Sequence, residues 1–357
     1  MTTIPPRTAR RTGPEIRRST SARGSVEVLI GSAVAGLSLA ALLVTRVLSA
    51  VNVGGFVVLA YLLFLVFYGA VVWFMEHDSR TVRDRLVFIA VHSLAVVALL
   101  ALLFVVGFTF WRGREALGHL NFFTSDMKLA GPLDPLSVGG ILHAAVGTLI
   151  ELTIALCCTV PLGLACAAYL NETRGPLTRF VRTVVEAMTA LPAILGALFI
   201  YASVILTLGS TKSGLAAGLA IGVMMLPIII RASDVVLRLV PGSLKEASFA
   251  LGAPRWRTVW HVVLPSARSG LTTAVLLGSA RGLGETTPVL ITAGFGSGLN
   301  LNPTSGPMVS LPLVTYIFSR FPQPTMIARA FGAGTALLAV VLVLFALVRV
   351  FGGSHVR

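Results

Sequence analysis

The sequence predicts an all-α, polytopic helical membrane protein, and three observations support that fold class. Hydrophobic residues are 55% of the 357-residue chain, and its mean hydropathy is +0.89. Charged residues are 12%, about half of the roughly 25% that is usual in soluble proteins. Eight apolar segments are long enough to cross a bilayer, which takes about 20 residues each. Helices are expected because every backbone polar group in lipid must be paired within its own segment.

The eight segments follow a short basic N-terminal region. Residues 1–25 contain six arginines and one acid but almost no large apolar residue, which predicts a disordered cytoplasmic tail. The segments after it cover residues 27–45, 52–75, 86–110, 138–169, 181–208, 214–236, 270–292 and 325–351. Two longer external loops, roughly 111–137 and 293–324, are long enough to fold over a mouth or to contact an external partner.

The positions of the basic residues predict the topology. If both termini are cytoplasmic, the cytoplasmic segments contain 20 of the 28 lysines and arginines, and the external segments contain seven. Arg281 is the remaining one and lies within a span. Membrane proteins show this bias toward the cytoplasmic side. The bias accounts for the net charge of +14 and the pI near 11.1, so no nucleic-acid partner is expected.

The sequence lacks the common motifs of catalysis. A nucleotide-hydrolysing P-loop needs GxxxxGK[ST], and none of the three lysines, Lys128, Lys212 and Lys245, follows a glycine. There is no HExxH or GxSxG motif, and the three cysteines lie in one apolar run without metal-ligand spacing. We expect a chain that is not an enzyme, holds no metal and binds no cofactor of its own.

A twenty-residue polar interruption, "EASFALGAPRWRTVWHVVLP", lies in the longest predicted cytoplasmic loop. Pro241-Gly242-Ser243 predicts a helix start, and a short helix is expected over 244–251, with Gly252 as its left-handed C-cap. Pro254 is expected to start a second short helix that Leu264-Pro265 closes. Such an elbow could plug into a partner's groove or lie as an amphipathic loop at the lipid headgroups. The residues alone leave both roles open.

The stretch "SARGLGETTPVLITAG", which begins at Ser279, carries a charge inside the seventh segment. An unpaired Arg281 there costs a few kcal/mol on insertion scales. Glu285, four residues on, lies on the same helical face and can pair with it. The pair either locks helix packing or places a guanidinium fork beside an anion pathway. Three nearby residues favour close packing and a local break: Gly282, Gly284 and Pro288.

The polar interruption resembles the "EAA---G---------I-LP" signature of bacterial ABC importer permeases. Its spacing is matched here, with Ser248 and Val262 as mild departures. In that family the elbow is the coupling helix, which docks on a separate ATPase subunit. The resemblance implies that the residues coupling this chain to the ATPase are Glu246, Ala247, Gly252, Leu264 and Pro265. ATP and Mg would be bound by that partner chain.

Further stretches resemble phosphate-importer permeases of the PstA type. Residues 280–288, "ARGLGETTP", resemble the family's "ARAxGETAP" segment. Three other stretches, residues 147–172, 185–199 and 311–318, resemble further segments of the same family. The resemblance implies that the chain takes part in phosphate import. It also implies a substrate pathway lined by Arg281, Glu285 and Thr286.

The resemblance further implies an architecture and a set of partners. It covers roughly residues 85–351, so an importer core of six helices is expected over 81–357, with a coupling loop at 241–268. Two additional N-terminal helices, at 26–80, lie outside it. The implied partners are a homologous permease of the PstC type, an ATPase dimer of the PstB type and an extracytoplasmic phosphate-binding protein of the PstS type. The expected location is the bacterial plasma membrane, with both termini cytoplasmic.

Two other functions remain open. The chain could be an ABC permease for another oxyanion or a small solute, because most selectivity would lie in the binding protein. It could also be an ion-coupled secondary transporter with Glu151 and Glu285 as proton carriers, although the coupling loop would then be unexplained. Glu186 is expected to form an interfacial salt bridge with Arg182, whereas the role of Glu151 stays open between a pathway residue and a buried partner of another helix.

Overall fold

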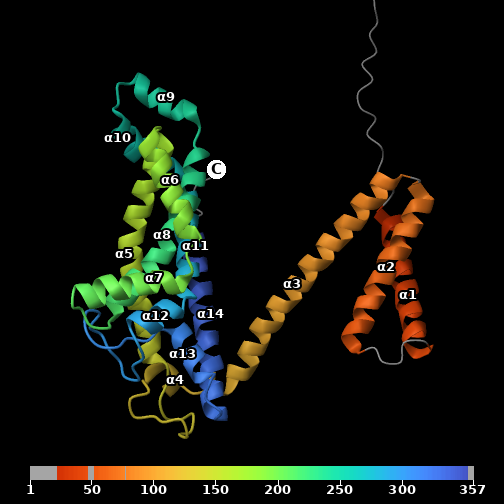
Figure 1. Ribbon diagram of the computed structural model, residues 1–357, viewed down its shortest axis with the longest axis horizontal. Helices are drawn as coiled ribbons and strands as arrows, with labels where there is room; N and C mark the ends of the chain where they lie inside the picture. Colours follow the sequence, from red (N-terminus) through yellow and green to blue (C-terminus); the bar gives the residue numbers. More distant parts are fainter. Residues whose placement is uncertain (1–21, 47–51, 77, 353–357) are drawn as a thin grey trace, which may run out of the picture. The chain divides into compact units, whose positions relative to one another are not determined.

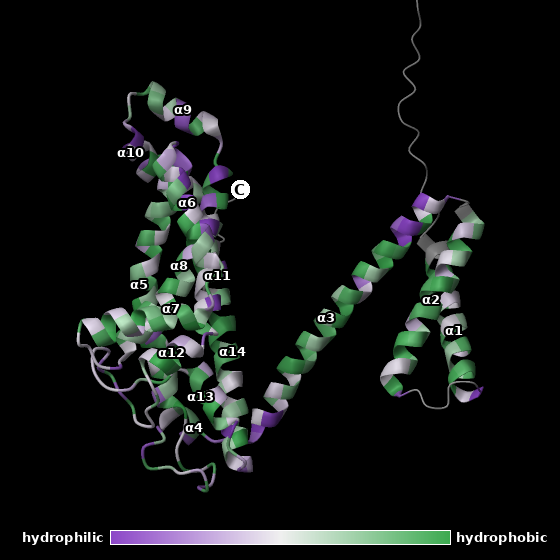
Figure 2. Ribbon diagram, viewed as in Figure 1, coloured by the Kyte–Doolittle hydropathy of each residue, from purple (hydrophilic) through white to green (hydrophobic). Residues whose placement is uncertain are grey.

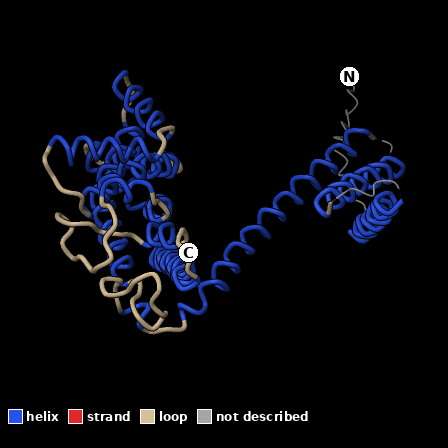
Figure 3. The backbone as a smooth tube through the Cα atoms, turned by 60° about the horizontal axis from the view of Figure 1, so that its bottom comes forward, coloured by secondary structure: helices blue, strands red, loops and turns tan. Residues whose placement is uncertain are grey.

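The computed structural model describes residues 22–46, 52–76 and 78–352 of the chain. Helices, turns and loops account for these residues, and no strand occurs among them (Figure 3). Within these ranges, six helices are long and apolar enough to cross a membrane, or seven segments if one bent pair counts as a span. The all-α class of a polytopic membrane protein is confirmed. Of the predicted tail, residues 1–21 lie outside the described part.

The chain divides into two compact units, residues 1–103 and 104–357. The division falls within one helix, α3 (Ser79–Leu117), whereas the sequence predicts a boundary between residues 80 and 81. The first half of α3 groups with the preceding helices, and the hydroxyls of Tyr61 and Ser93 form a hydrogen bond of 2.5 Å. A functional core that begins at residue 81 stays a prediction.

The first unit is built on two helices, α1 (Ala22–Arg46) and α2 (Val53–Glu76). Ser32, Gly36 and Ala40 recur every four residues on α1 and are all buried. A Cβ atom on Gly36 would lie 2.7 Å from the backbone nitrogen of Phe64. Small residues therefore let the two helix backbones approach closely, as is common between membrane helices. Because α1 begins at Ala22, the last four residues of the predicted tail are helical.

The second unit is a bundle of long helices that run between two ends (Figure 1). Its long helices are α5 (Leu142–Glu172), α8 (Gly214–Arg238), α11 (Leu264–Leu283) and α14 (Pro324–Gly352). One end, called the α9 end, carries α9 (Gly242–Ala250) and α10 (Arg255–Thr258). The opposite end, called the α13 end, carries α4 (Asn121–Thr124) and α13 (Leu311–Phe318). Apolar residues dominate between the ends, and polar residues gather at the α9 end (Figure 2).

Glycines bring α5 and α8 together in the core of this unit. A Cβ atom on Gly218 would lie 2.7 Å from the Cβ of Ile154, and one on Gly163 would lie 2.8 Å from the Cγ2 of Ile229. Buried apolar side chains fill the contact between these points. In lipid there is little hydrophobic driving force for helix association, so close van der Waals packing stabilises the pair instead. This helix pair forms the centre of the unit.

The fifth predicted span is bent rather than straight. The segment predicted at 181–208 forms α6 (Pro176–Thr189) and α7 (Ala193–Ile200), and α7 continues as the π-helix η1 (Tyr201–Thr207). The two parts are bent by 108° at the break, and α7 lies across the long helices (Figure 1). Pro192 lies at the break. Its ring has no N–H and disfavours helical backbone at the preceding residue, which accounts for the break.

The seventh predicted span, 270–292, is interrupted. α11 ends at Leu283, and α12 (Thr287–Thr292) begins after a three-residue gap. Gly284 is the C-cap of α11, and Pro288 lies in the first turn of α12. The local break that the sequence predicts here is confirmed. A hydropathy profile cannot show the interruption because both helices are apolar.

At the α13 end, two long loops, residues 125–141 and 293–310, are hydrogen-bonded to each other. The N–H of Leu299 donates to Oδ2 of Asp126 at 2.9 Å. Arg329 of α14 is buried and donates to three backbone carbonyls of the first loop, at 2.7, 2.8 and 3.3 Å. The loops are therefore fixed to one another and to a long helix, which gives this end of the bundle a defined surface.

Candidate functional site

The α9 end contains the helix–glycine–helix elbow that the sequence predicts. α9 ends at Ala250, and Gly252 after it has a φ of +80°, a left-handed conformation that favours glycine. The N–H of Gly252 donates to the carbonyl of Phe249 at 2.9 Å. Pro254 then directly precedes α10. The predicted C-cap and the predicted second helix start are both confirmed.

The second arm of the elbow does not end at Leu264-Pro265, so that prediction is wrong. α10, the π-helix η2 (Val259–Val263) and α11 follow one another without a gap. The N–H of Leu264 donates to the carbonyl of Val259, which is a bond across five residues. This wider turn directly precedes Pro265, which has no N–H to donate to a helical hydrogen bond. The elbow is therefore joined to α11 by continuous helix.

A side-chain hydrogen bond joins the two arms of the elbow. Oγ of Ser248 on α9 lies 2.8 Å from Oγ1 of Thr258 on α10, and Thr258 is buried. Ser248 is one of the two positions at which the chain departs from the importer signature, and here the departure supplies a contact. The bond therefore links α9 to α10 across the turn at Gly252.

The outer surface of the elbow is exposed and largely apolar. Leu251, Trp256 and Trp260 are among its exposed large side chains. Glu246 and Ala247 are also exposed, on α9. Monomeric proteins seldom expose apolar side chains in groups without a partner. The arrangement therefore suits contact with another protein or with lipid headgroups better than contact with water.

Lys245 fastens α9 to the end of α5. Its Nζ pairs with the carboxylate of Glu172 and donates to Oδ1 of Asn171 at 2.9 Å. The side chains of Lys245 and Glu172 are 20% and 19% exposed, so the pair is partly shielded from water. Sequence reasoning missed this link, because 73 residues separate the two partners and no local pattern indicates the contact.

The ion pair predicted inside the seventh segment is present. Nη1 of Arg281 lies 2.9 Å from Oε1 of Glu285. Arg281 belongs to the last turn of α11, whereas Glu285 lies in the break and donates its N–H to the carbonyl of Gly282. The carboxylate side chain is 8% exposed and the guanidinium side chain 60% exposed. The pair therefore has one end fixed in the core and one end on the surface of the bundle.

This pair lies midway along the bundle. A Cβ atom on Gly282 would lie 2.5 Å from the sulfur of Met225, in the middle of α8. A guanidinium facing lipid at this depth costs a few kcal/mol on insertion scales. The exposed face of Arg281 therefore needs a polar pathway or a second chain beside it. Thr286 lies in the same break and is half-buried.

A second buried carboxylate reaches the same region. Glu151 of α5 is 1% exposed, and neither of its carboxylate oxygens has a hydrogen-bond partner in the described part of the chain. With Glu285, Thr148 and Ser310 it lines a cavity of about 10 Å³, which is room for about one water molecule. No group of three or more His, Cys, Asp or Glu side chains among the described residues could hold a metal ion. Two acids, Glu151 and Glu285, therefore border this small cavity.

The predicted salt bridge between Arg182 and Glu186 is wrong. Nη1 of Arg182 lies 3.3 Å from Oδ2 of Asp234, and Arg238 donates to the same oxygen at 2.7 Å. Glu186 is exposed and pairs with no cation that the structure describes. The physical reason is that α8 packs beside α6 and brings a carboxylate to Arg182 from 52 residues away.

Comparison with known proteins finds clear relatives. Residues 159–354 match the family described as binding-protein-dependent transport system inner membrane component. The phosphate transport system permease protein PstA 1 of Mycobacterium tuberculosis is 38% identical over 247 residues, which cover 69% of this chain and 81% of that protein. The phosphate transport system permease protein PstA of Mycobacterium leprae is 34% identical over 263 residues, 73% of this chain and 86% of that protein. A chain of the inward-facing MetNI methionine ABC transporter aligns with a TM-score of 0.49 and 19% identity, over 61% of this chain and 95% of that chain.

Proposed function

We propose that this chain, which belongs to the family of binding-protein-dependent transport system inner membrane components, is the permease subunit of an ATP-driven importer of inorganic phosphate. The observation that carries the proposal is the Arg281–Glu285 ion pair, which presents a 60% exposed guanidinium midway along an apolar bundle. The names of the relatives, which are phosphate transport permeases at 34–38% identity, agree with an anionic cargo.

Arg281 is the residue proposed to contact the passing anion. A guanidinium offers a planar fork of N–H donors that fits phosphate oxygens and keeps its charge at any working pH. Glu285 holds that fork in place and competes with the anion for it. The negative charge beside the site would keep binding weak enough for release. The hydroxyl of Thr286, in the same break, would add a donor to the pathway.

The elbow is proposed to couple the pathway to ATP. A separate ATPase would bind ATP and Mg, close as a dimer and move the elbow through Glu246, Ala247 and Gly252. The continuous helix through Leu264-Pro265 would carry that movement along α11 to Arg281. ATP binding would thereby shift the population between outward-open and inward-open states, without covalent chemistry in this chain.

The same proposal assigns partners to the surfaces of the second unit. A homologous permease of the PstC type would cover the exposed face of Arg281 and complete the pathway. An ATPase dimer of the PstB type would take the apolar surface of the elbow. A phosphate-binding protein of the PstS type would meet the α13 end. The location would be the bacterial plasma membrane, with the α9 end and both termini cytoplasmic.

One observation favours a second candidate function. Glu151 and Glu285 border one small cavity, and Glu151 has no hydrogen-bond partner within the described ranges. Buried acids at membrane depth are common proton carriers in secondary transporters. An ion-coupled transporter would use these acids directly, but it would leave the exposed elbow without a role.

Reconstitution separates the two functions. The transporter, assembled with its partner permease and ATPase in proteoliposomes, is tested for uptake of radiolabelled phosphate after addition of the binding protein. We expect uptake with ATP and none with a non-hydrolysable analogue. Uptake that continues without ATP and follows an imposed proton gradient would establish the secondary transporter instead. Sulfate and molybdate, added as competitors, test whether phosphate is the preferred oxyanion.

A further inference from the structure

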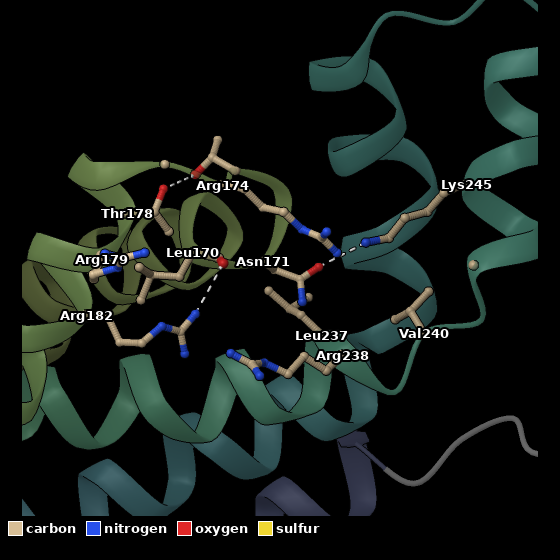
Figure 4. A pocket seen from close by; sticks show the side chains of 13 residues that line it. Leu170, Asn171, Arg174, Thr178, Arg179, Arg182, Leu237, Arg238, Val240 and Lys245 are labelled. Carbon is tan, nitrogen blue, oxygen red and sulfur yellow. Dashed lines mark hydrogen bonds between the residues drawn. The ribbon is translucent and has the colours of Figure 1, made fainter.

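A basic pocket of about 630 Å³ opens at the α9 end of the second unit. Its wall is formed by the end of α5, the start of α6, the end of α8 and the start of α9 (Figure 4). Its cationic side chains are Arg174, Arg179, Arg182, Arg238 and Lys245. The function proposed above does not use this pocket, because the proposed anion site at Arg281 lies midway along the bundle.

The pocket carries more positive charge than the nearby acids balance. Asp234 pairs with both Arg182 and Arg238, and Glu172 pairs with Lys245. Arg174 and Arg179 form no ion pair with any residue that the structure describes. Five cations thus meet two carboxylates. A concave surface with such an excess focuses its field and attracts multiply charged anions.

The start of α6 adds to that attraction. α6 has 14 residues and begins at Pro176, directly after the pocket residue Gly175. The first N–H groups of a helix have no acceptor inside it and carry partial positive charge, which makes a helix N-terminus a favourable place for phosphate. Thr178 in this first turn is buried, and its hydroxyl is hydrogen-bonded to that of Thr173 at 3.0 Å. The wall is therefore ordered before any ligand binds.

The cations come from three helices, α6, α8 and α9, and from the turn between α5 and α6. Figure 4 shows Arg174 extending toward Lys245, and Arg182 and Arg238 extending toward one another. We propose that this pocket binds a phosphate group, held by the guanidinium forks of Arg174 and Arg179 and by the first turn of α6. The group is either inorganic phosphate or the headgroup of an anionic phospholipid, since both present the same oxygens.

A bound phosphate group would affect the elbow. It would lie against the start of α9, because Lys245, which already fastens that arm to α5, also lines the pocket. An elbow held by this added contact moves less, so phosphate accumulated on that side would slow its own import. The regulatory part rests on the proposed function, which places the α9 end in the cytoplasm, whereas binding to the pocket does not.

The test measures binding in a background that lacks the pathway arginine. The assembled transporter carrying R281Q is placed in phosphatidylcholine nanodiscs, and radiolabelled inorganic phosphate is measured by equilibrium dialysis. We expect R281Q to retain phosphate binding at the pocket. Adding R174Q and R179Q, which leave no buried acid unpaired, should weaken binding about tenfold or more. The matched control, R255Q with R257Q, removes the same charge from α10, outside the pocket, and should leave binding unchanged.

The outcomes separate the possible sources and the rival explanations. If phosphatidylglycerol in the nanodisc displaces inorganic phosphate, the pocket holds a headgroup; if it does not, the pocket holds the free ion. Equal binding with and without R174Q and R179Q would overturn the proposal, and so would an equal loss in the α10 control. Binding by the permease subunits that disappears when the ATPase is added would show a protein interface and would also overturn it. Pocket binding in a complex with the native Arg281 that does not transport phosphate would count only against the proposed function.

Discussion

Two charged regions of the second unit differ in how their cationic side chains are paired with acids. At the α9 end, Asp234 is shared by Arg182 and Arg238, with further cations within the same pocket. Midway along the bundle, Arg281 has a single partner, Glu285. The first region lies where water and counterions can replace a lost charge. The second lies among apolar helices, where nothing nearby can replace it.

The difference predicts how each region responds to substitution. Exposed ion pairs contribute about 0–1 kcal/mol each, so the α9 end should lose function in small steps. A charge in the middle of a membrane segment costs a few kcal/mol and is retained only where it is used. Removing Arg281 or its partner should therefore have the largest effects on transport.

The largest effect is expected for Arg281→Gln. The substitution keeps a polar side chain of similar length but removes the charge and the fork. We expect phosphate uptake to fall about a hundredfold, because a charged hydrogen-bonding group contributes about 1.5–3 kcal/mol. Arg281→Lys should retain a small part of the uptake. If R281Q were present in normal amounts in the membrane and took up phosphate at the wild-type rate, Arg281 would not belong to the pathway. The ion pair would then serve only helix packing.

Glu285→Gln should lower transport by about thirtyfold, which corresponds to about 2 kcal/mol. With the competing carboxylate gone, the anion should bind more tightly and leave more slowly. Both the maximal uptake rate and the half-saturating phosphate concentration should therefore fall. A purely structural pair would instead lower the thermal stability and leave the half-saturating concentration unchanged. Glu151→Gln is the comparison: it should keep uptake within about twofold, because no charge pair is broken, whereas a proton carrier would lose all transport.

At the α9 end, Gly252→Val should lower uptake about tenfold. A left-handed backbone costs a residue with a side chain about 1–2 kcal/mol, and a Cβ atom at Gly252 would otherwise meet open space. Gly252→Asn should retain most of the uptake, since asparagine tolerates this conformation. Equal losses in both variants would show that the surface of the elbow, and not its turn, is what matters. Uptake of radiolabelled phosphate, normalised to assembled complex, measures both.

Lys245→Met should have a smaller effect, about fivefold in uptake, because the lost pair with Glu172 contributes about 1 kcal/mol. Glu172→Gln should cause a similar loss. If the pair acts as a link, the double variant should lose little more than either single variant, which a double-mutant cycle measures. Additive losses would mean that Lys245 and Glu172 act separately, and that α9 is not fastened to α5 through them.

The features that could be predicted from the sequence depend on interactions between residues a few positions apart. Gly252 and Pro254 are turn residues whose backbone preference acts within a few positions, so the elbow was predictable. The Arg281–Glu285 pair was predictable because a spacing of four residues brings two side chains together on a helix, and the pair forms although α11 ends at Leu283 and Glu285 lies in the break. The apolar character of the segments was also predictable from composition, but eight spans were expected, whereas six helices, or up to seven spans, among the described residues could cross a membrane. The 108° bend near Pro192 was not predictable, since hydropathy does not distinguish a straight run from a bent one.

The features that sequence missed all depend on distant contacts. Lys245 and Glu172 are 73 residues apart, and Arg182 and Asp234 are 52 residues apart. Neither pair has a local pattern, and in the second case a nearer acid, Glu186, was the wrong partner. The cavity beside Glu151 needs side chains from several helices and a loop. Helix packing determines such contacts, and it cannot be inferred from a single sequence.

The smallest effect is expected at the α13 end, where Asp126 holds the two loops together. Its carboxylate accepts from the N–H groups of Leu299 at 2.9 Å and Lys128 at 3.1 Å. These backbone donors lower the pKa of Asp126 below its usual 3.8, because they favour the charged form. The contribution to stability is therefore present above about pH 4 and is lost as the pH falls through the lowered pKa.

Asp126→Asn keeps one acceptor oxygen and removes the charge. We expect the loops to open about twofold more often at neutral pH, since the site is near the surface and a hydrogen bond contributes about 1 kcal/mol or less. Limited proteolysis of residues 293–310 measures the opening. The wild type should become more sensitive as the pH falls below about 4, and D126N should lose that part of the pH dependence. The same acid sensitivity in both proteins would show that another group controls the loops, and that charge at this end matters even less than at the α9 end.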